Sequence, residues 1–368
     1  MARLGLGEGW TCALANEWDA AKAQAYRARF GAAPELRVGD VADLAPADLP
    51  GRATLAWASF PCQDLSLAGA RRGLAGARSG TFFSFWRLIE GAAVQGRAPA
   101  VIALENVVGA LTSHDGRDFE ALVALLSGQG YRVGALVIDA VRFLPQSRPR
   151  LFVIAVRDRG AIEGLTAAAP DPLWTTPALA RAEEALPDAL RRRWVWWRLP
   201  APPPRNTDLA AILEPDPAVS AWHRPEQTAR LIDLMGPASR ARLDAMQAAG
   251  ARRAATLYRR TRPDGHGGKI QRAELRCDGI AGCLRTPAGG SSRQTVVIVE
   301  GERVRSRLLT GGEAARLMGV PDDYPIPKSA TAAQHLFGDG VAVPVVRWLA
   351  QHLLEPLADA APLPVAAE

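Results

Sequence analysis

One cysteine lies at a position where a reactive side chain is expected. Residues 59–69 read SFPCQDLSLAG, and Cys62 follows an apolar run that ends at Ala58, where a strand should give way to a loop. A thiol with a pKa of about 8.5 is little ionised at neutral pH, so a nucleophilic cysteine needs a base or a cation nearby. None of the five histidines lies near a strand end that faces Cys62, which argues against a cysteine-protease dyad. A buried packing cysteine and a nucleophile remain the alternatives.

A glutamate and two arginines are the candidate partners of Cys62. Glu105 ends the apolar segment VIALE, and burial there would raise its pKa, so that a neutral carboxyl group could donate a hydrogen bond. Arg148 and Arg150 alternate in QSRPR, which places both on one face of an extended segment. They could lower the thiol pKa and clamp a planar substrate through bidentate hydrogen bonds. For Glu105 the alternative is structural, as a loop cap or the partner of an arginine.

Apolar strands alternate with helical segments through the first 157 residues. This alternation predicts an α/β fold with a doubly wound, mostly parallel sheet. Ligands bind such sheets beyond the carboxyl ends of the strands, where four polar clusters are expected to converge. The strand candidates are residues 10–16, 36–40, 52–59 and 101–105, with a paired set at 131–140 and 151–157. The polar clusters are Asn16-Glu17-Trp18, Asp40, Pro61-Cys62-Gln63 and Glu105-Asn106.

Composition limits the classes of protein and of partner. The net charge of +6 and the pI of about 9.5 suggest a polyanionic partner, although 41 of the 44 basic residues are arginine, which can also reflect a GC-rich genome. Four cysteines without a paired CxxC set predict neither a metal site nor a disulfide framework, and they fit a reducing cytoplasm. No apolar run reaches the roughly 18 residues of a membrane span.

The composition of the sequence changes after residue 156. Residues 160–290 are rich in Pro, Gly, Arg and Trp and lack periodicity, which predicts a second, smaller and irregular domain. Arginines interleaved with Trp194, Trp196 and Trp197 could contact phosphates and stack on bases, and a core tryptophan cluster is the equal alternative. The predicted domains are residues 1–158, 159–303 and 304–368, the last ending in a helix that returns to the first domain.

Five ordered motifs resemble those of DNA (cytosine-5) methyltransferases. They read FPCQ, LENV, QSRPRLFVIAVR, RLLTGGEAARLMGVP and HLFGDGVAVPVV. The motifs span 59–156 and 305–346, with a variable target-recognition region between them. The resemblance implies a methyltransferase fold that uses S-adenosylmethionine. It also implies double-stranded DNA as the partner, a cytoplasmic monomer with no metal, and a place in a restriction-modification system.

The resemblance assigns catalytic roles by position. Cys62 matches the nucleophile that adds to C6 of an extruded cytosine, and Glu105 matches the acid that contacts N3 and the exocyclic amine. The resulting enamine is nucleophilic at C5, which takes the methyl group, and loss of the C5 proton releases the enzyme. Arg150 matches the residue that holds the cytosine O2, with Arg148 as its support. Asn106 matches a residue that fixes the nucleophile loop.

The resemblance also assigns cofactor contacts. Glu17 corresponds to the carboxylate on the ribose, Trp18 to the wall against the adenine and Asp40 to the acceptor for its amine. Three further residues belong to this site by similarity, and at the last of them the family usually has asparagine: Pro61, Phe82 and Asp339.

Contacts with DNA are expected from two loops. Residues 66–79 are glycine-rich and basic and follow the nucleophile, which suits a loop that closes over DNA, although a plain surface loop is the alternative. In the tract 284–294, small hydroxyl groups suit contacts with phosphates, and Cys283-Leu284 stands where the family often has Thr-Leu. The predicted DNA contacts are Ser66, Arg71, Arg72, Thr286, Ser291 and Arg293.

The opening of the chain departs from the family pattern. The family begins with a strand and a glycine-rich FxGxGG turn, whereas MARLGLGEGW resembles the helix that follows that turn. Because no strand precedes Gly5, Gly7 and Gly9, they are not expected to form the turn. We therefore expect the first strand to be missing, either through a start site placed too far downstream or in a degraded gene. The missing motif motivates one rival function, a catalytically dead DNA-binding protein. A separate rival is the same scaffold acting on RNA, as an RNA cytosine-5 methyltransferase.

Overall fold

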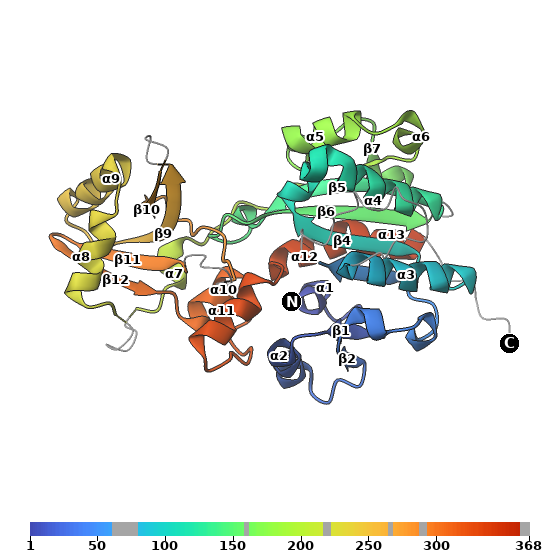
Figure 1. Cartoon of the computed structure of the whole chain (residues 1–368), viewed down its shortest axis with the longest axis horizontal. Helices are drawn as coiled ribbons and strands as arrows, with labels where there is room; N and C mark the ends of the chain where they lie inside the picture. The colour runs from blue at the N-terminus through green and yellow to red at the C-terminus, as the bar shows by residue number, and fades with distance from the viewer. Residues whose placement is uncertain (61–79, 158–161, 216–221, 264–267, 287–292, 361–368) are drawn as a thin grey trace. The chain divides into compact units, whose positions relative to one another are not determined.

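The computed structural model describes residues 1–60, 80–157, 162–215, 222–263, 268–286 and 293–360. Two compact units divide the chain (Figure 1). The larger unit consists of Leu6–Asp139, Pro149–Pro202 and Arg347–Glu368, and the smaller unit consists of Met1–Gly5, Ala140–Arg148 and Pro203–Val346. No helix in the described residues is long and apolar enough to cross a membrane.

The larger unit contains a short parallel sheet and a mixed sheet. In the short sheet, β1 (Ala15–Glu17) pairs with β2 (Leu36–Val38) through the connecting helix α2 (Ala20–Phe30). The mixed sheet has the order β3-β4-β6-β5. Its strands are β3 (Leu55–Ser59), β4 (Val101–Val107), β5 (Tyr131–Asp139) and β6 (Pro149–Arg157).

The prediction of one mostly parallel sheet is therefore only partly right. β3 and β4 are parallel, but β6 runs antiparallel to both β4 and β5. The connection between β5 and β6, residues 140–148, is too short for a helical crossover, so the two strands form an antiparallel pair. In the described residues β1 and β2 pair only with each other, so the strands divide between two sheets rather than forming a single one.

Two helices cover one face of the mixed sheet. The helices α3 (Thr81–Val94) and α4 (Arg117–Gly128) contribute aromatic and aliphatic side chains to a core that also contains Ile102, Leu104 and Val153. Residues 101–106 of β4 are all buried, which explains why this strand reads as a continuous apolar run. Glu105 and Asn106 thus extend from a rigid, fully packed strand.

The tryptophan cluster belongs to the core of the larger unit. Trp194 and Trp197 are only 8% and 2% exposed, and β8 (Trp196–Trp197) pairs with β7 (Thr166–Ala167). The alternative of a core cluster is the one observed. Consequently residues 162–202, with α5 (Pro177–Glu184) and α6 (Asp188–Arg191), lie in the larger unit, and the predicted boundary at 158/159 does not coincide with the boundary between the units.

The smaller unit is an ordered domain, so the prediction of an irregular domain is wrong. Its antiparallel sheet has the order β10-β9-β11-β12, and a core beneath it includes Leu243, Leu257 and Val297. The strands are β9 (Arg253–Pro263), β10 (Lys269–Arg276), β11 (Thr295–Glu300) and β12 (Arg303–Leu308). The helices are α1 (Ala2–Leu6), α7 (Leu209–Ile212), α8 (Pro225–Asp233), α9 (Pro237–Ala248), α10 (Gly311–Leu317), α11 (Ala330–Gly338) and α12 (Val343–Leu349), with α1 and α12 extending past the unit boundary.

The closing motifs and the end of the chain divide between the units. Residues 304–346 belong to the smaller unit, whereas the chain from Arg347 onward belongs to the larger one. There a π-helical turn, Ala350–Leu354, links α12 to α13 (Glu355–Ala360), and Leu357 is fully buried. The last helix is thus part of the unit that contains β4 and β6.

Candidate functional site

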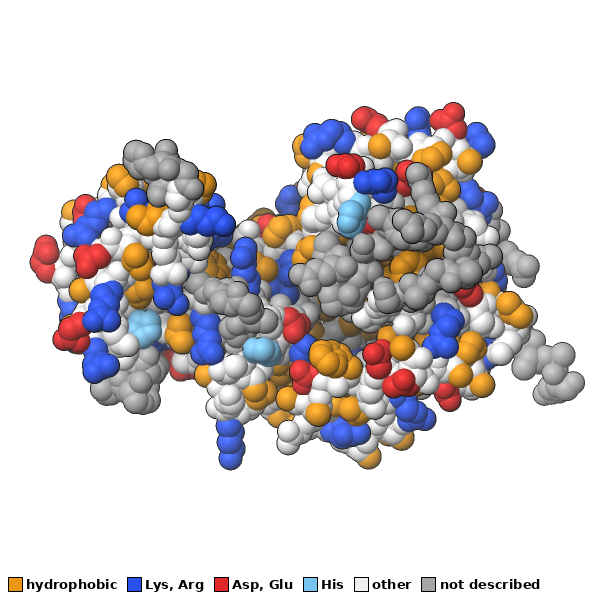
Figure 2. All heavy atoms as spheres, viewed as in Figure 1, with side chains coloured by type: hydrophobic (Ala, Val, Ile, Leu, Met, Phe, Trp, Pro, Cys, Tyr) orange, Lys and Arg blue, Asp and Glu red, His pale blue; other side chains and the backbone are white. Residues whose placement is uncertain are grey.

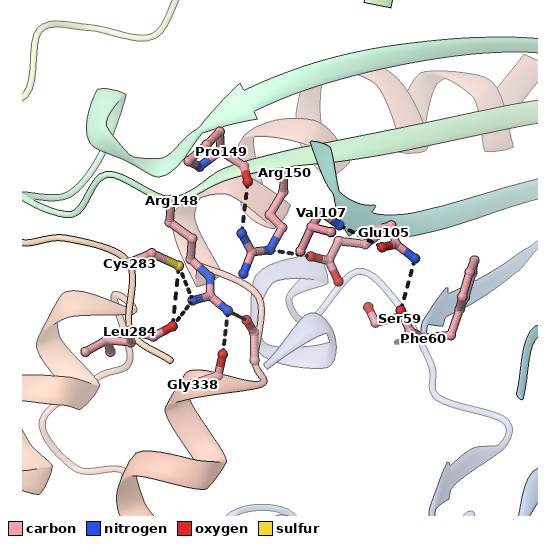
Figure 3. A network of polar contacts seen from close by, with 12 residues as sticks. Ser59, Phe60, Glu105, Val107, Arg148, Pro149, Arg150, Cys283, Leu284 and Gly338 are labelled. Carbon is pink, nitrogen blue, oxygen red and sulfur yellow. Dashed lines mark hydrogen bonds and ion pairs between the residues drawn. The ribbon is translucent and has the colours of Figure 1, made fainter. Parts of the chain in front are cut away.

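Glu105 and Arg150 form an ion pair at one end of the mixed sheet. The antiparallel register places Val107 of β4 opposite Arg150 of β6, and Glu105 opposite Phe152. Side chains of residues 150 and 152 share a face, so Arg150 lies diagonally beside Glu105. Its Nε is 3.1 Å from Glu105 Oε1, with the two side chains 14% and 8% exposed (Figure 3). Glu105 is thus paired with an arginine, as expected if its role were structural. That arginine, Arg150, is also the residue predicted to hold the substrate.

Asn106 anchors the backbone that leads to the predicted nucleophile. Successive residues of a strand face opposite sides, so Asn106 points to the face opposite Glu105. Its Nδ2 donates to the carbonyl oxygen of Phe60 at 3.0 Å, and its Oδ1 accepts from the amide of Val107 (Figure 3). The parallel register also sets Ser59 beside Glu105. Cys62 itself lies outside the described residues, two positions after Phe60.

Arg148 does not act on the same partners as Arg150. Arg148 belongs to the smaller unit and comes directly before β6 in the sequence. Only 2% of it is exposed. One terminal nitrogen donates to the carbonyl oxygen of Leu284 at 2.9 Å, and the other donates to the carbonyl oxygens of Gly338 at 2.8 Å and Gly340 at 2.6 Å (Figure 3). These contacts do not support the prediction that Arg148 clamps a substrate. They make it a positioning residue that fastens residue 284 to the 338–340 turn.

Replacing Arg148 with methionine should destabilise the protein. The three carbonyl oxygens would lose a charged donor, and each unsatisfied buried acceptor costs about 1–3 kcal/mol. We expect the free energy of unfolding to fall by about 3 kcal/mol, measured by urea denaturation followed by circular dichroism. Arg240→Met is the control, because Arg240 is 53% exposed and its one ion pair within the described residues is with Asp244 on its own helix. Equal stabilities of the two variants would contradict the positioning role.

Gln146 also contacts Leu284, although the sequence pattern had predicted no role for it. It is fully buried, its Nε2 donates to the carbonyl oxygen of Leu317 at 2.6 Å, and its Oε1 accepts from the amide of Leu284 at 3.0 Å. Gln146 and Arg148 therefore bind the two main-chain groups of the same residue. Its role could have been predicted from its place two residues before Arg148 in QSRPR, since alternate residues of an extended segment share a face.

Three predicted cofactor residues come together at the ends of β1 and β2. The strands pair in register up to Glu17 and Val38, and the amide of Gly39 donates to the carbonyl oxygen of Glu17. Glu17 Oε1 accepts from the amide of Asp19 at 2.9 Å, and Asp40 Oδ1 accepts from the amide of Ala42 at 2.9 Å. Both carboxylates are thus held by the backbone at the carboxyl ends of neighbouring parallel strands.

The indole of Trp18 is open to a ligand. This side chain is 77% exposed, which is unusual for a large aromatic residue beside two ordered carboxylates. An exposed indole face can stack on a purine, and carboxylates accept hydrogen bonds from ribose hydroxyls and from an amine. This set of donors and acceptors fits an adenosine group.

Two of the other predicted cofactor residues, Phe82 and Asp339, can be described. Phe82 is fully buried, and its ring packs on Phe60 with centroids 5.0 Å apart, so it fills the core instead of lining a surface. Asp339, in the smaller unit, accepts a hydrogen bond from Thr286 Oγ1. Pro61 lies outside the described residues. Gly5 is inside α1, where an added Cβ would clash with the side chain of Val346, so close packing explains its presence.

Two of the predicted DNA contacts can be placed. Thr286 donates a hydrogen bond to Asp339, which the resemblance assigned to the cofactor. Arg293 donates to Thr331 Oγ1 at 2.7 Å. Both therefore lie in the smaller unit next to the helix and turn at 330–340. Four other predicted contacts lie outside the described residues: Ser66, Arg71, Arg72 and Ser291.

Comparison with known proteins agrees with this geometry. The sequence profile described as C-5 cytosine-specific DNA methylase matches residues 2–355. The type II methyltransferase M.BsuFI of Bacillus subtilis is 28% identical over 357 residues, covering 96% of this chain and 70% of that protein. M.NgoBI of Neisseria gonorrhoeae, another type II methyltransferase, is 28% identical over 347 residues, covering 94% of this chain and 86% of the relative.

A solved structure shares the fold at low sequence identity. The Dnmt2 methyltransferase of S. pombe superposes with a TM-score of 0.56 at 15% identity, covering 94% of this chain and 91% of the other. The profile match extends from α1 to the start of α13 and includes β4, β6 and the sheet of the smaller unit. The chain therefore belongs to the C-5 cytosine-specific DNA methylase family and is a DNA cytosine-5 methyltransferase.

Proposed function

We propose that Cys62, Glu105 and Arg150 act together on one cytosine that has left the base stack of double-stranded DNA. The observation that carries this proposal is the ion pair of Glu105 and Arg150, 3.1 Å apart on adjacent strands. A carboxyl group and a guanidinium group side by side can contact the N3 edge and the O2 of one pyrimidine ring.

Each group has a defined task at the ring. The Cys62 thiolate adds to C6 and opens the C5–C6 double bond. The product is an enamine, in which nitrogen lone pairs raise the electron density at C5, so C5 becomes nucleophilic. In its protonated form Glu105 favours this addition by donating that proton to N3, and Arg150 stabilises the charge that develops on O2. After methylation, water takes the proton from C5, the C5–C6 double bond re-forms, and Cys62 leaves as a thiolate while the N3 proton returns to Glu105.

Extrusion of the base is required by geometry. C6 of cytosine cannot be reached by a thiol within a stacked duplex, so the nucleotide must rotate out, at a cost of a few kcal/mol. Contacts between the protein and DNA must offset this cost. Positive charge favours such contacts, and the chain has a net charge of +6.

Glu17, Trp18 and Asp40 are proposed to hold the cofactor. S-adenosylmethionine, when bound, supplies an electrophilic methyl group on its sulfonium sulfur. Trp18 would stack on the adenine, Glu17 would accept from the ribose hydroxyls, and Asp40 would accept from the adenine amine. The exposed indole and the two backbone-held carboxylates support this assignment.

Replacement of Trp18 by alanine should weaken cofactor binding. Loss of one aromatic–base stack costs roughly 1–3 kcal/mol, so we expect the Kd for S-adenosylmethionine to rise about tenfold or more, measured by isothermal titration calorimetry. Trp18→Phe should retain most of the affinity, and Val94→Ala, which changes another exposed apolar residue, should retain all of it. An unchanged Kd for Trp18→Ala would remove the indole from the cofactor site.

Methyl transfer to DNA and to RNA distinguishes the proposal from its rivals. Purified protein would be incubated with methyl-tritiated S-adenosylmethionine and either unmethylated plasmid DNA or tRNA. We expect label in DNA, at C5 of cytosines that bisulfite sequencing then locates. Label confined to tRNA would favour an RNA enzyme, and retained DNA affinity with no transfer would favour a catalytically dead protein.

A further inference from the structure

Strands β9 and β10 extend beyond the sheet of the smaller unit. β11 pairs with β9 only from Arg253 to Leu257. From Tyr258 to Pro263, β9 is paired with β10 alone, through residues 269–274 (Figure 1). We call this pair of segments the ribbon. Six residues per strand give it a length of about 20 Å.

One face of the ribbon carries three arginines. Residues 258, 260 and 262 share a face of β9, and the antiparallel register places Arg272 of β10 directly opposite Arg260. Glu274 supplies the one carboxylate on this face. Its oxygens are 3.3 Å from Arg260 Nε and 2.5 Å from Arg262 Nη2. Figure 2 shows several Lys and Arg side chains on the visible face of the smaller unit, over and beside β9 and β10.

Of these three arginines, Arg272 is the one that Glu274 does not pair with. None of the ion pairs or hydrogen bonds of the described residues involves its guanidinium group, and its neighbour across the strands is another arginine. Like charges at directly opposed positions destabilise a β-ribbon. A partner that accepts hydrogen bonds from both guanidinium groups would turn this repulsion into attraction, so the surface favours a polyanion.

The dimensions of the ribbon select one kind of contact. The major groove of DNA is about 12 Å wide and admits a two-stranded β-ribbon, and the guanidinium fork matches the O6 and N7 acceptors of guanine. We propose that the arginine pair of the ribbon, Arg260 and Arg272, reads guanine in the major groove of the DNA target. This inference rests on the assignment of the chain as a DNA methyltransferase and specifies what it recognises.

Arg272→Lys tests the inference because it keeps the charge and removes the fork. A lysine still binds phosphate as a point charge, but it cannot match two acceptors of guanine in one plane. The control is Arg259→Lys, on the opposite face of the same ribbon, where the opposing residue is Ala273. Unmethylated phage DNA would be methylated by wild type and by each variant, and bisulfite sequencing would report the bases that flank every methylated cytosine.

The expected result is a change of sequence preference at one position. Wild type should require a guanine near its cytosine, and Arg272→Lys should lower the preference for that guanine by roughly ten- to a hundredfold, while Arg259→Lys keeps it. An unchanged consensus for Arg272→Lys with the same total methylation would overturn guanine reading, since contact with phosphate alone would give that outcome. If wild type and Arg259→Lys both methylate no DNA, the proposed methyltransferase function itself is overturned, together with guanine reading. This outcome differs from a loss of preference confined to Arg272→Lys.

A stability measurement separates recognition from folding. Because Arg272 opposes a like charge, Arg272→Gln should leave the melting temperature unchanged or raise it. The same variant should lose the guanine preference. A clear fall in melting temperature would identify Arg272 as a structural residue and would also overturn the inference.

Discussion

Glutamine in place of Glu105 is expected to lower kcat by about 10²–10⁴-fold, the usual contribution of a positioned acid or base. The amide preserves the shape of the buried side chain. It cannot donate a proton to N3, and it also removes the ion-pair partner of Arg150. Single-turnover transfer of tritiated methyl groups to a DNA duplex would measure this loss apart from product release.

The controls for Glu105→Gln address folding and binding. Glu163→Gln changes an exposed glutamate of the larger unit and should keep the wild-type rate. DNA affinity, measured by fluorescence anisotropy, should change little in Glu105→Gln, because one cytosine contributes a small part of a large charged interface. A rate within threefold of wild type would show that Glu105 is a structural partner of Arg150 and nothing more.

Serine in place of Cys62 is expected to abolish methyl transfer. A hydroxyl group is far less acidic than a thiol, and the sequence provides no histidine at a strand end near Cys62 that could serve as its base. The variant should still bind DNA, since the substitution removes one sulfur atom and no charge at the surface. Transfer of label to DNA and binding by anisotropy are the two measurements.

Cys277 offers a matched control for this variant. It is an exposed cysteine of the smaller unit, and Cys277→Ser should methylate DNA at the wild-type rate. Measurable turnover by Cys62→Ser would refute the nucleophile assignment. Loss of activity in both variants would instead indicate that thiol chemistry elsewhere affects the assay.

The sequence predicted the elements of the larger unit well because their signals are local. Buried strands such as β4 and β6 read as short apolar runs, and α3 and α4 follow helical spacing. The sheet of the smaller unit escaped prediction for a physical reason. Beyond Tyr258 the side chains of β9 are exposed arginine, threonine and proline, so the alternation of apolar and polar residues is lost.

The site was predictable only where it depends on position along one strand. Glu105 and Asn106 were identified at the end of an apolar run, and Arg150 by its place in a motif. The acceptors of Arg148 lie 136–192 residues further along the chain, at Leu284, Gly338 and Gly340. One sequence contains no trace of such long-range pairs. The inward orientation of Phe82 likewise depends on tertiary packing against Phe60.

The adjacency of Glu105 and Asn106 has a dynamic consequence. Glu105 is paired with Arg150, and Asn106 is hydrogen-bonded to the backbone two residues before Cys62. We therefore expect a thermal displacement of β4 to move Glu105 and the carbonyl group of Phe60 in the same direction, so that their separation varies less than the position of either. Cavity-forming substitutions under β4, such as Leu104→Ala, should accordingly broaden that separation and slow the chemical step while leaving encounter with DNA at its normal rate.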